Sequence, residues 1–296
     1  MGLRKDIWKV FLVKKSLQDI MTSGFLPDTA LDITGDLKFY TFLADPFGLK
    51  EDNIFYIFAE YYDYRTRKGI IECLSFDENI ALRERKTVLS EPWHLSYPYV
   101  FKHADSFYLL PEASKNNKLT LYQADIFPDK WKKLCDIDLG GDIAVDATPF
   151  FHNGLWWLFY MLATKSPGRQ HELHVAYASC LTGPWTRHKQ NPIQKGAASS
   201  RPGGTPITLP NGSIILPVQD CLTTYGRGIR PLIFDALTPD HIYCTTGSLL
   251  KIPTSLAPYI EGLHTLSSIG DMTLIDVKKT DLSAKGIVLQ ILRELK

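Results

Sequence analysis

The sequence has few of the features that would place it outside the ordinary globular proteins. Its 296 residues include only five cysteines and no Cys-x-x-Cys pair, so neither a disulfide framework nor a zinc site is indicated. No run approaches the roughly 20 apolar residues that span a bilayer. The 33 basic and 32 acidic side chains leave a net charge of +1, which gives no electrostatic reason to expect a nucleic-acid partner.

The N-terminal segment also lacks a recognisable secretion signal. Lys9 interrupts its apolar stretch, Lys14 and Lys15 end it, and no small-residue cleavage site follows. We therefore expect a cytoplasmic protein with reduced thiols. The basic, amphipathic start of the chain is also compatible with contact at a membrane surface, but a β-strand is the preferred interpretation.

Helical periodicity is scarce as well, and Lys15–Ser23 is the only segment that predicts a short helix. Aromatic residues make up 12% of the chain, and its apolar stretches are short and bounded by turn residues. These stretches predict β-strands. Examples are Ile54–Phe58, Ser106–Leu110, Leu155–Tyr160 and Ser213–Leu216. The composition therefore indicates an all-β protein.

An internal repeat organises these strands. Four anchor positions, separated by 52, 49 and 58 residues, begin the repeats: Asp45, Tyr97, Asp146 and Gly204. Seven or eight residues after each anchor stands a turn pair of the kind that joins two strands in a hairpin: Asp52-Asn53, Ala104-Asp105, Asn153-Gly154 and Asn211-Gly212. A fifth, weaker copy begins at His264 and carries its turn at Gly270-Asp271.

A period near 50 residues with four strands in each unit is typical of a β-propeller blade. We expect one five-bladed β-propeller domain over residues 1–296. Its blades are predicted at 41–92, 93–142, 143–198, 199–256 and 257–296. The segment of about residues 1–40 would close or flank the ring, with a closing strand around Ile7–Val13. A two-sheet sandwich is the alternative fold, although it would not require so regular a repeat.

The repeat also predicts which side chains meet. In a propeller the first strand of each blade lines the channel and the second returns beside it, so an anchor and the residue 15 positions later lie at the same channel mouth. We expect this mouth to gather Asp45, Glu60, Tyr97, Glu112, Asp146, Gln219 and His264. Asp220 and the loop 199–204 should lie beside them.

Carboxyl groups that crowd together raise one another's pKa, so that one becomes an acid and its neighbour a base. Glycosidic-bond chemistry uses such a pair. We therefore take Asp45, Asp146, Glu60 and Glu112 as candidate catalytic residues. Each also has a structural interpretation, because an acidic residue at a strand entrance can simply accept backbone N–H groups.

A second group of residues is predicted to bind substrate. Arg201 offers a planar fork of donors for a phosphate or carboxylate, and aromatic rings can stack on sugars. The predicted substrate-binding residues are Arg201, His264, Tyr97, Trp93, Asp220 and Gln219. His264 could equally be a satisfied channel histidine, and packing is the simpler role for Tyr97.

No protein metal site or cofactor is predicted. His171 and His174 resemble a metal motif, but on a strand they would point to opposite faces. Clustered carboxylates and a histidine could attract a cation into the channel, although the sequence does not give its ligands.

Several short segments resemble the N-terminal domain of glucosamine inositolphosphorylceramide transferases and, more distantly, the five-bladed propellers of family 43, 32 and 130 carbohydrate-active enzymes. The segments are 44–47, 58–60, 94–98, 110–112, 121–122, 127–128, Trp131 and 264–265. The resemblance implies that Asp45 is a general base or nucleophile and that Asp146 tunes the acid. Thr164–Gln170 occupies the region of the family 43 acid, and Ser96–Pro98 stands where invertase-like propellers carry Arg-Asp-Pro.

These observations together favour a carbohydrate-active enzyme that transfers an activated sugar during surface-glycan assembly. The alternatives are a glycoside hydrolase or phosphorylase of the same fold and a non-catalytic glycan-binding propeller. The expected partners are a carbohydrate or activated sugar substrate and, peripherally, a membrane-associated glycan assembly system.

Overall fold

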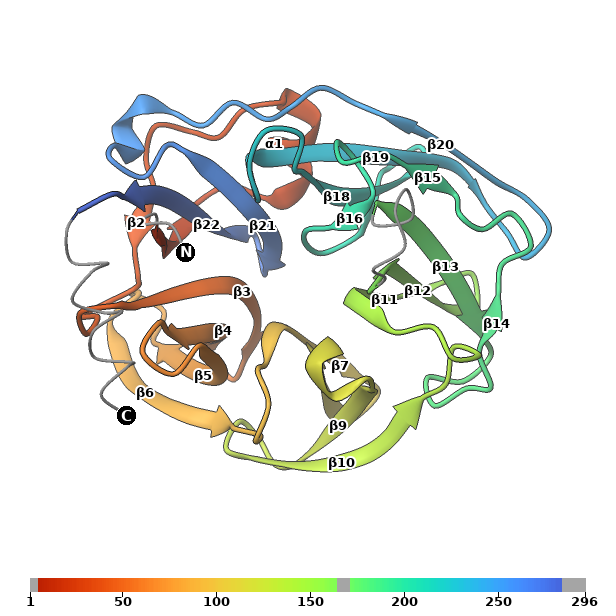
Figure 1. Cartoon of the computed structure of the whole chain (residues 1–296), viewed down its shortest axis with the longest axis horizontal. Helices are drawn as coiled ribbons and strands as arrows, with labels where there is room; N and C mark the ends of the chain where they lie inside the picture. Colours follow the sequence, from red (N-terminus) through yellow and green to blue (C-terminus); the bar gives the residue numbers. More distant parts are fainter. Residues whose placement is uncertain (1–4, 164–170, 284–296) are drawn as a thin grey trace.

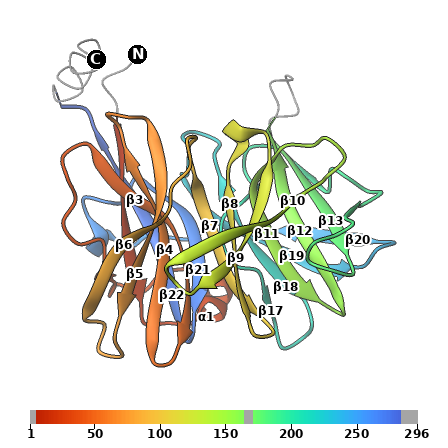
Figure 2. The ribbon, with the colours of Figure 1, turned by 90° about the horizontal axis from the view of Figure 1, so that it is seen from below.

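The structure, a computed structural model that describes residues 5–163 and 171–283, is a ring of five antiparallel sheets around a central channel (Figure 1). In the first four sheets the strand that comes first along the chain lies nearest the channel, whereas in the fifth sheet the start of the chain supplies the outer strands. Figure 2 shows the same ring from the side. The prediction of a five-bladed β-propeller is confirmed.

The first three sheets follow one another along the chain. The first contains β3 (Thr41–Glu51), β4 (Ile54–Asp63), β5 (Lys68–Phe76) and β6 (Leu82–Leu89). The second contains β7 (Ser96–His103), β8 (Ser106–Glu112), β9 (Leu119–Ile126) and β10 (Lys130–Ile137). The third contains β11 (Ala144–His152), β12 (Leu155–Leu162), β13 (Glu172–Ala178), β14 (Thr186–Arg187) and β15 (Gln194–Lys195).

The fourth and fifth sheets depart from this simple order. In the fourth, two short inner strands pair with β18: they are β16 (Arg201–Pro202) and β17 (Ile207–Thr208). The remaining strands of that sheet are β18 (Ile214–Asp220), β19 (Gly228–Leu237) and β20 (Ile242–Thr246). The fifth contains β21 (Gly262–Ile269), β22 (Met272–Asp281), β1 (Lys5–Val13) and β2 (Leu31–Asp32). Because β1 pairs with β22 along its whole length, the start of the chain completes the last sheet and covers an exposed edge.

The helical elements are short. Helix α1 (Leu17–Ser23) begins after Ser16, whose hydroxyl accepts the Asp19 N–H, and ends at Gly24 in the left-handed region. The described part of the chain also contains two single 3-10 turns, η1 (Ser114–Asn116) and η2 (Thr254–Leu256). None of the helices in the described ranges is long and apolar enough to cross a membrane.

Apolar side chains fill the five interfaces between neighbouring sheets. Alternate residues of each strand point to opposite faces, so every sheet presents one apolar set to each neighbour. The cluster between the first two sheets, for example, contains Phe47, Phe58, Ile71, Leu95, Val100 and Leu109. All five cysteines are free thiols, as predicted.

The hairpin turns lie where the sequence placed them. Asp52 and Asn53 both have positive φ angles, as does the Asn153-Gly154 pair, which is the conformation of a type I′ turn. Each turn joins the first strand of a sheet to the second, so it lies at the channel end opposite the anchor residues. The two ends of the channel are therefore chemically different.

Candidate active site

A β-bulge in the inner strands shapes the channel mouth. In the first three sheets the strand register shifts at the anchor residue. Asp45, Tyr97 and Asp146 have φ angles of 50°, 44° and 51° there, a conformation that costs a non-glycine residue roughly 1–2 kcal/mol. The same strain in three sheets shows that the bulge belongs to the repeat, and such strain is concentrated at functional sites.

The anchor residues link the sheets to one another. The Tyr97 N–H donates to Asp45 Oδ2 at 3.1 Å, while the Tyr97 hydroxyl lies 2.9 Å from Thr148 Oγ1 and accepts the Gly204 N–H at 3.0 Å. The Thr265 hydroxyl donates to Asp45 Oδ1 at 2.8 Å. This belt of hydrogen bonds fixes Asp45 from two neighbouring sheets and makes Tyr97 a fully buried structural residue.

A cavity of about 380 Å³ opens at this mouth. Three predicted carboxylic acids line it, together with Arg201, aromatic rings and small polar groups. The lining consists of Phe42, Asp45, Glu60, Tyr62, His94, Ser96, Glu112, Ser114, Val145, Met161, Arg201 and Tyr225. The structure thus brings together acidic groups that lie far apart in the sequence.

Glu60 is the unusual member of this cavity. Only 5% of Glu60 is exposed to solvent, and its carboxyl group makes no hydrogen bond to any described residue. His94 Nε2 lies 3.6 Å from its Oε1. Burial, and then the charges of Asp45 and Glu112, raise the pKa of Glu60 well above its ordinary value. Glu60 therefore keeps its proton where an ordinary glutamate would lose it.

Glu112 stands on the equivalent position of the next sheet but has a different environment. Its Oε2 accepts the Ser96 hydroxyl at 3.2 Å, and its Oε1 accepts the Ser114 N–H at 2.9 Å. Both oxygens are therefore occupied as acceptors. Of the two glutamates that the sequence offered as the acid, Glu60 is the one with a free carboxyl group.

His264 lies beneath Asp45 and does not line the cavity. Its ring stacks on Trp8 of β1, with ring centroids 3.7 Å apart. Nδ1 lies 2.6 Å from Asp276 Oδ2, and Nε2 lies 3.5 Å from Asp45 Oδ1. Burial alone would lower the pKa of His264, but Asp276 and Asp45 raise it above its ordinary value. The two carboxylates thus favour the charged form of His264.

Asp45, His264 and Asp276 offer donor atoms within 4.8 Å of one another, which is close enough for a metal ion. The carboxylate oxygens are nevertheless already used. Asp276 accepts the backbone N–H groups of Asp45, His264 and Thr265 at 2.8–3.0 Å. With its oxygens hydrogen-bonded and the imidazole between the carboxylates, the cluster is balanced by its own groups.

Asp146 is held under the same mouth by Arg201 and Gln219. Arg201 Nε lies 2.5 Å from Asp146 Oδ2, and the Gln219 amide donates to the same oxygen at 3.0 Å. Burial raises the pKa of Asp146 to about 6 against the opposing charge of Arg201. Gln219 is fully buried, so it positions Asp146 and does not reach the cavity.

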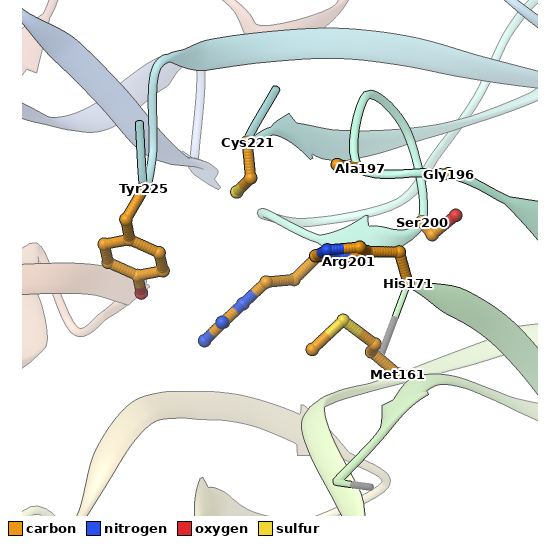
Figure 3. A pocket seen from close by; sticks show the side chains of 8 residues that line it. All are labelled: Met161, His171, Gly196, Ala197, Ser200, Arg201, Cys221 and Tyr225. Carbon is orange, nitrogen blue, oxygen red and sulfur yellow. The ribbon is translucent and has the colours of Figure 1, made fainter. Parts of the chain in front are cut away.

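A second pocket of about 240 Å³ adjoins the cavity and shares Met161, Arg201 and Tyr225 with it. In Figure 3 the guanidinium of Arg201 extends between Tyr225 and Met161, and its Cζ lies 4.9 Å from the centre of the Tyr225 ring. The terminal Nη atoms of Arg201 have no hydrogen-bond partner among the described residues. The remaining lining residues are His171, Gly196, Ala197, Ser200 and Cys221.

Two further predicted substrate-binding residues, like Tyr97, Gln219 and His264, line neither pocket. Asp220 is fully buried and pairs with Arg230, 2.9 Å from Nε, and with Arg227 at 3.7 Å. Because it follows Gln219 on a strand, its side chain points to the opposite face. Trp93 packs against the apolar cluster between the first two sheets. Thr164–Gln170, where the family 43 acid would stand, lies outside the described residues.

Sequence reasoning missed the residues that support Asp45 and Glu60. Trp8 and Asp276 support Asp45 through His264, while His94 and Gly69 lie against Glu60. Asp276 had a signal, since it is an acidic residue inside the apolar strand 274–277. Trp8 lies in the predicted closing strand around Ile7–Val13, but nothing in the sequence pairs its ring with His264.

Three comparisons show which known proteins this chain resembles. The family described as "Glucosamine inositolphosphorylceramide transferase 1, N-terminal" matches residues 31–251. Glucosamine inositolphosphorylceramide transferase 1 of Oryza sativa subsp. indica is 36% identical over 206 residues, and that of Arabidopsis thaliana is 34% identical over 203. Each alignment covers 67% of this chain but only 27% and 26% of the relative. The match thus spans about a quarter of these curated proteins.

Among solved structures, a family 117 glycoside hydrolase from Zobellia galactanivorans has a TM-score of 0.54 at 12% identity, covering 96% of this chain and 93% of its own. An α-L-arabinofuranosidase from Podospora anserina has a TM-score of 0.55 at 11% identity, with 80% and 90% covered. At this identity the likeness shows the shared fold alone.

Proposed function

This chain belongs to the family of N-terminal domains of glucosamine inositolphosphorylceramide transferases, and we propose that it is an enzyme that forms or breaks a glycosidic bond at the acidic channel mouth. Transfer of an activated sugar is the favoured reaction, because the family relatives are named as transferases. Surface-glycan assembly in the cytoplasm, with peripheral contact to a membrane-associated assembly system, is the proposed setting.

The observation that carries this proposal is the contrast between two neighbouring carboxyl groups. Glu60 is buried, free of hydrogen bonds and raised in pKa, so it serves as the general acid that protonates the leaving oxygen. Asp45 is fixed by hydrogen bonds to both of its oxygens, so it serves as the general base or nucleophile. Such a division of roles between two carboxyl groups is what glycosidic-bond chemistry requires.

The remaining residues position these two and the substrate. Asp146 holds Arg201 through Nε, which leaves the terminal nitrogens of Arg201 to bind an anionic or hydroxyl group of the substrate. His264 and Asp276 hold Asp45 from below. The acidic cavity would take the sugar that reacts, and the adjoining pocket would take the group to which it is joined.

Product analysis tests the proposal. The protein is incubated with nucleotide sugars, with sugar 1-phosphates and with aryl glycosides, each with and without phosphate, and the products are identified by mass spectrometry. Transfer, phosphorolysis and hydrolysis give different products. Asp45→Asn and Glu60→Gln should each lower turnover by about 10²–10⁴-fold, whereas Glu72→Gln, on the outer part of the first sheet, should not.

A glycoside hydrolase is the second candidate function, because the solved structures of similar fold include glycoside hydrolases. It predicts that aryl glycosides are cleaved without any added acceptor. A glycan-binding propeller without catalysis would bind sugars, turn none of them over and tolerate Asp45→Asn. Full turnover by Asp45→Asn or Glu60→Gln would refute the proposed site.

A further inference from the structure

His94 contacts Glu60 from outside the strands. It lies in the connection between β6 and β7, lines the cavity, and places Nε2 3.6 Å from Glu60 Oε1. Its ring meets the edge of Tyr62, with centroids 5.7 Å apart at 79°. His94 is therefore a polar side chain that faces the carboxyl group of Glu60.

The hydrogen bond on the other ring nitrogen fixes the tautomer of His94. The Gly69 N–H donates to His94 Nδ1 at 2.8 Å. A nitrogen that accepts a hydrogen bond carries no proton, so the neutral ring must carry its proton on Nε2. The group that faces Glu60 is therefore a donor, and Oε1 of Glu60 must be an acceptor.

Gly69 is required for this arrangement. A Cβ added there would lie 2.3 Å from the Leu95 carbonyl oxygen, 2.6 Å from Glu60 Oε1 and 2.9 Å from His94 Cε1. Cβ atoms in proteins are essentially never found within 3.0 Å of such atoms, so any other residue at position 69 would clash. Only glycine lets the backbone N–H reach the histidine while the glutamate stays beside both.

The charges around His94 are mixed. Glu60, Glu112 and Asp45 face it from β4, β8 and β3, and Lys115 faces it from η1. The acidic groups favour a charged ring, but burial has the larger effect and lowers the pKa of His94. The neutral ring fits the acceptor role of Nδ1.

We propose that His94 is the positioning residue of the general acid: its Nε2–H faces Oε1 of Glu60, so that the acid proton resides on Oε2. Once Glu60 has given its proton to the leaving oxygen, the Nε2–H donates a hydrogen bond to the carboxylate. The 3.6 Å contact then shortens, as catalytic hydrogen bonds often do during reaction. This assignment rests on the proposed function, in which Glu60 is the acid.

Nuclear magnetic resonance tests the pairing without a substrate. The ¹³Cδ signal of Glu60, assigned by its loss in Glu60→Gln, is followed from pH 4 to pH 10 in the full chain. In His94→Leu the donor that stabilises ionised Glu60 is gone, so the titration midpoint should rise by about one pH unit. His94→Gln, which can place an amide donor near Oε1, should recover at least half of that shift.

His241→Leu is the matched control, because His241 is exposed in the turn between the outer strands β19 and β20 of the fourth sheet. It should leave the midpoint unchanged. An unchanged midpoint in His94→Leu would overturn the proposal. If His94→Leu fails to fold, the ¹⁵N spectrum of the unaltered protein decides: a proton on Nε2 of His94 supports the proposal, and a proton on Nδ1 overturns it. Failure of the proposed function would appear elsewhere, as full turnover by Glu60→Gln.

Discussion

Glu60 shows how a single buried carboxyl group can lower the stability of a folded protein. A carboxyl group that is nearly inaccessible and lacks a hydrogen bond is destabilising, and more so when ionised. Proteins keep such groups where chemistry needs a displaced pKa. Glu112, in the matching place of the next sheet, has two hydrogen bonds and shows how the same position looks when its carboxyl group is satisfied.

This cost makes the stability of the protein depend on pH. The pKa of Glu60 is higher in the folded than in the unfolded chain, where it is about 4.5. The stability that proton binding at Glu60 gives to the folded protein is therefore fully present below the unfolded pKa, and it is lost as the pH rises through the folded pKa. Each pH unit in that window removes up to about 1.4 kcal/mol. Glu60→Gln should therefore gain stability relative to the unaltered protein as the pH rises.

Urea unfolding at pH 5 and pH 8 measures this difference. The advantage of Glu60→Gln should be larger at pH 8, while Glu72→Gln, which breaks an ion pair with Arg85, should show no such increase. Equal differences at both pH values would mean that Glu60 is ionised in the folded protein.

Tyr97 provides a second prediction at this scale. Its hydroxyl accepts the buried Gly204 N–H and contacts Thr148. Tyr97→Phe leaves that N–H without its partner, which should lower the free energy of unfolding by about 1–3 kcal/mol. Because the ring is fully buried, the KM for a sugar substrate should stay the same. A raised KM with unchanged stability would restore Tyr97 as a substrate contact.

At the level of elements, strand β1 has two roles. It completes the fifth sheet through its pairing with β22, and it places the indole of Trp8 under His264. Lys278 Nζ lies 5.2 Å from that indole and 2.5 Å from the Tyr225 carbonyl oxygen. Closure of the ring is thus coupled to the residues that support Asp45.

Removing the indole should separate these roles. Trp8→Ala leaves a cavity beneath His264 and should lower the free energy of unfolding by about 3–5 kcal/mol. Trp8→Phe keeps an aromatic face and should recover more than half of that loss. Thermal unfolding followed by circular dichroism measures both variants. Equal losses in the two would show that the ring contact with His264 is unimportant.

The elements were easier to predict than the supports of the site. Turn pairs such as Asn153-Gly154 have a local conformational preference, so the strands beside them could be located from the sequence. The bulges at Asp45 and Asp146 could not be located in this way, because neither residue belongs to a turn pair of this kind. Asp220 was expected to lie beside the mouth residues, but the alternation of side chains along β18 turns it away.

At the scale of the whole molecule, the repeat itself made the cavity predictable. Five sheets in a ring bring equivalent positions to one channel end, so Asp45, Glu60 and Glu112 could be grouped without knowing any contact. The repeat does not show which side chains form hydrogen bonds with each of these carboxyl groups. That depends on residues that differ between sheets, such as Ser96 beside Glu112 and His94 beside Glu60.

The ring also has a working face and an opposite face, and insertions should distinguish them. A six-residue Gly-Ser insert in the Asn153-Gly154 turn, on the face opposite the mouth, should leave turnover within about twofold, since exposed turns tolerate added length. The same insert after Leu222, in the exposed loop that carries Tyr225 to the cavity, should lower turnover at least tenfold. Both variants should keep the circular dichroism spectrum of the unaltered protein. Equal turnover in the two would mean that the reaction does not take place at the mouth lined by Asp45 and Glu60.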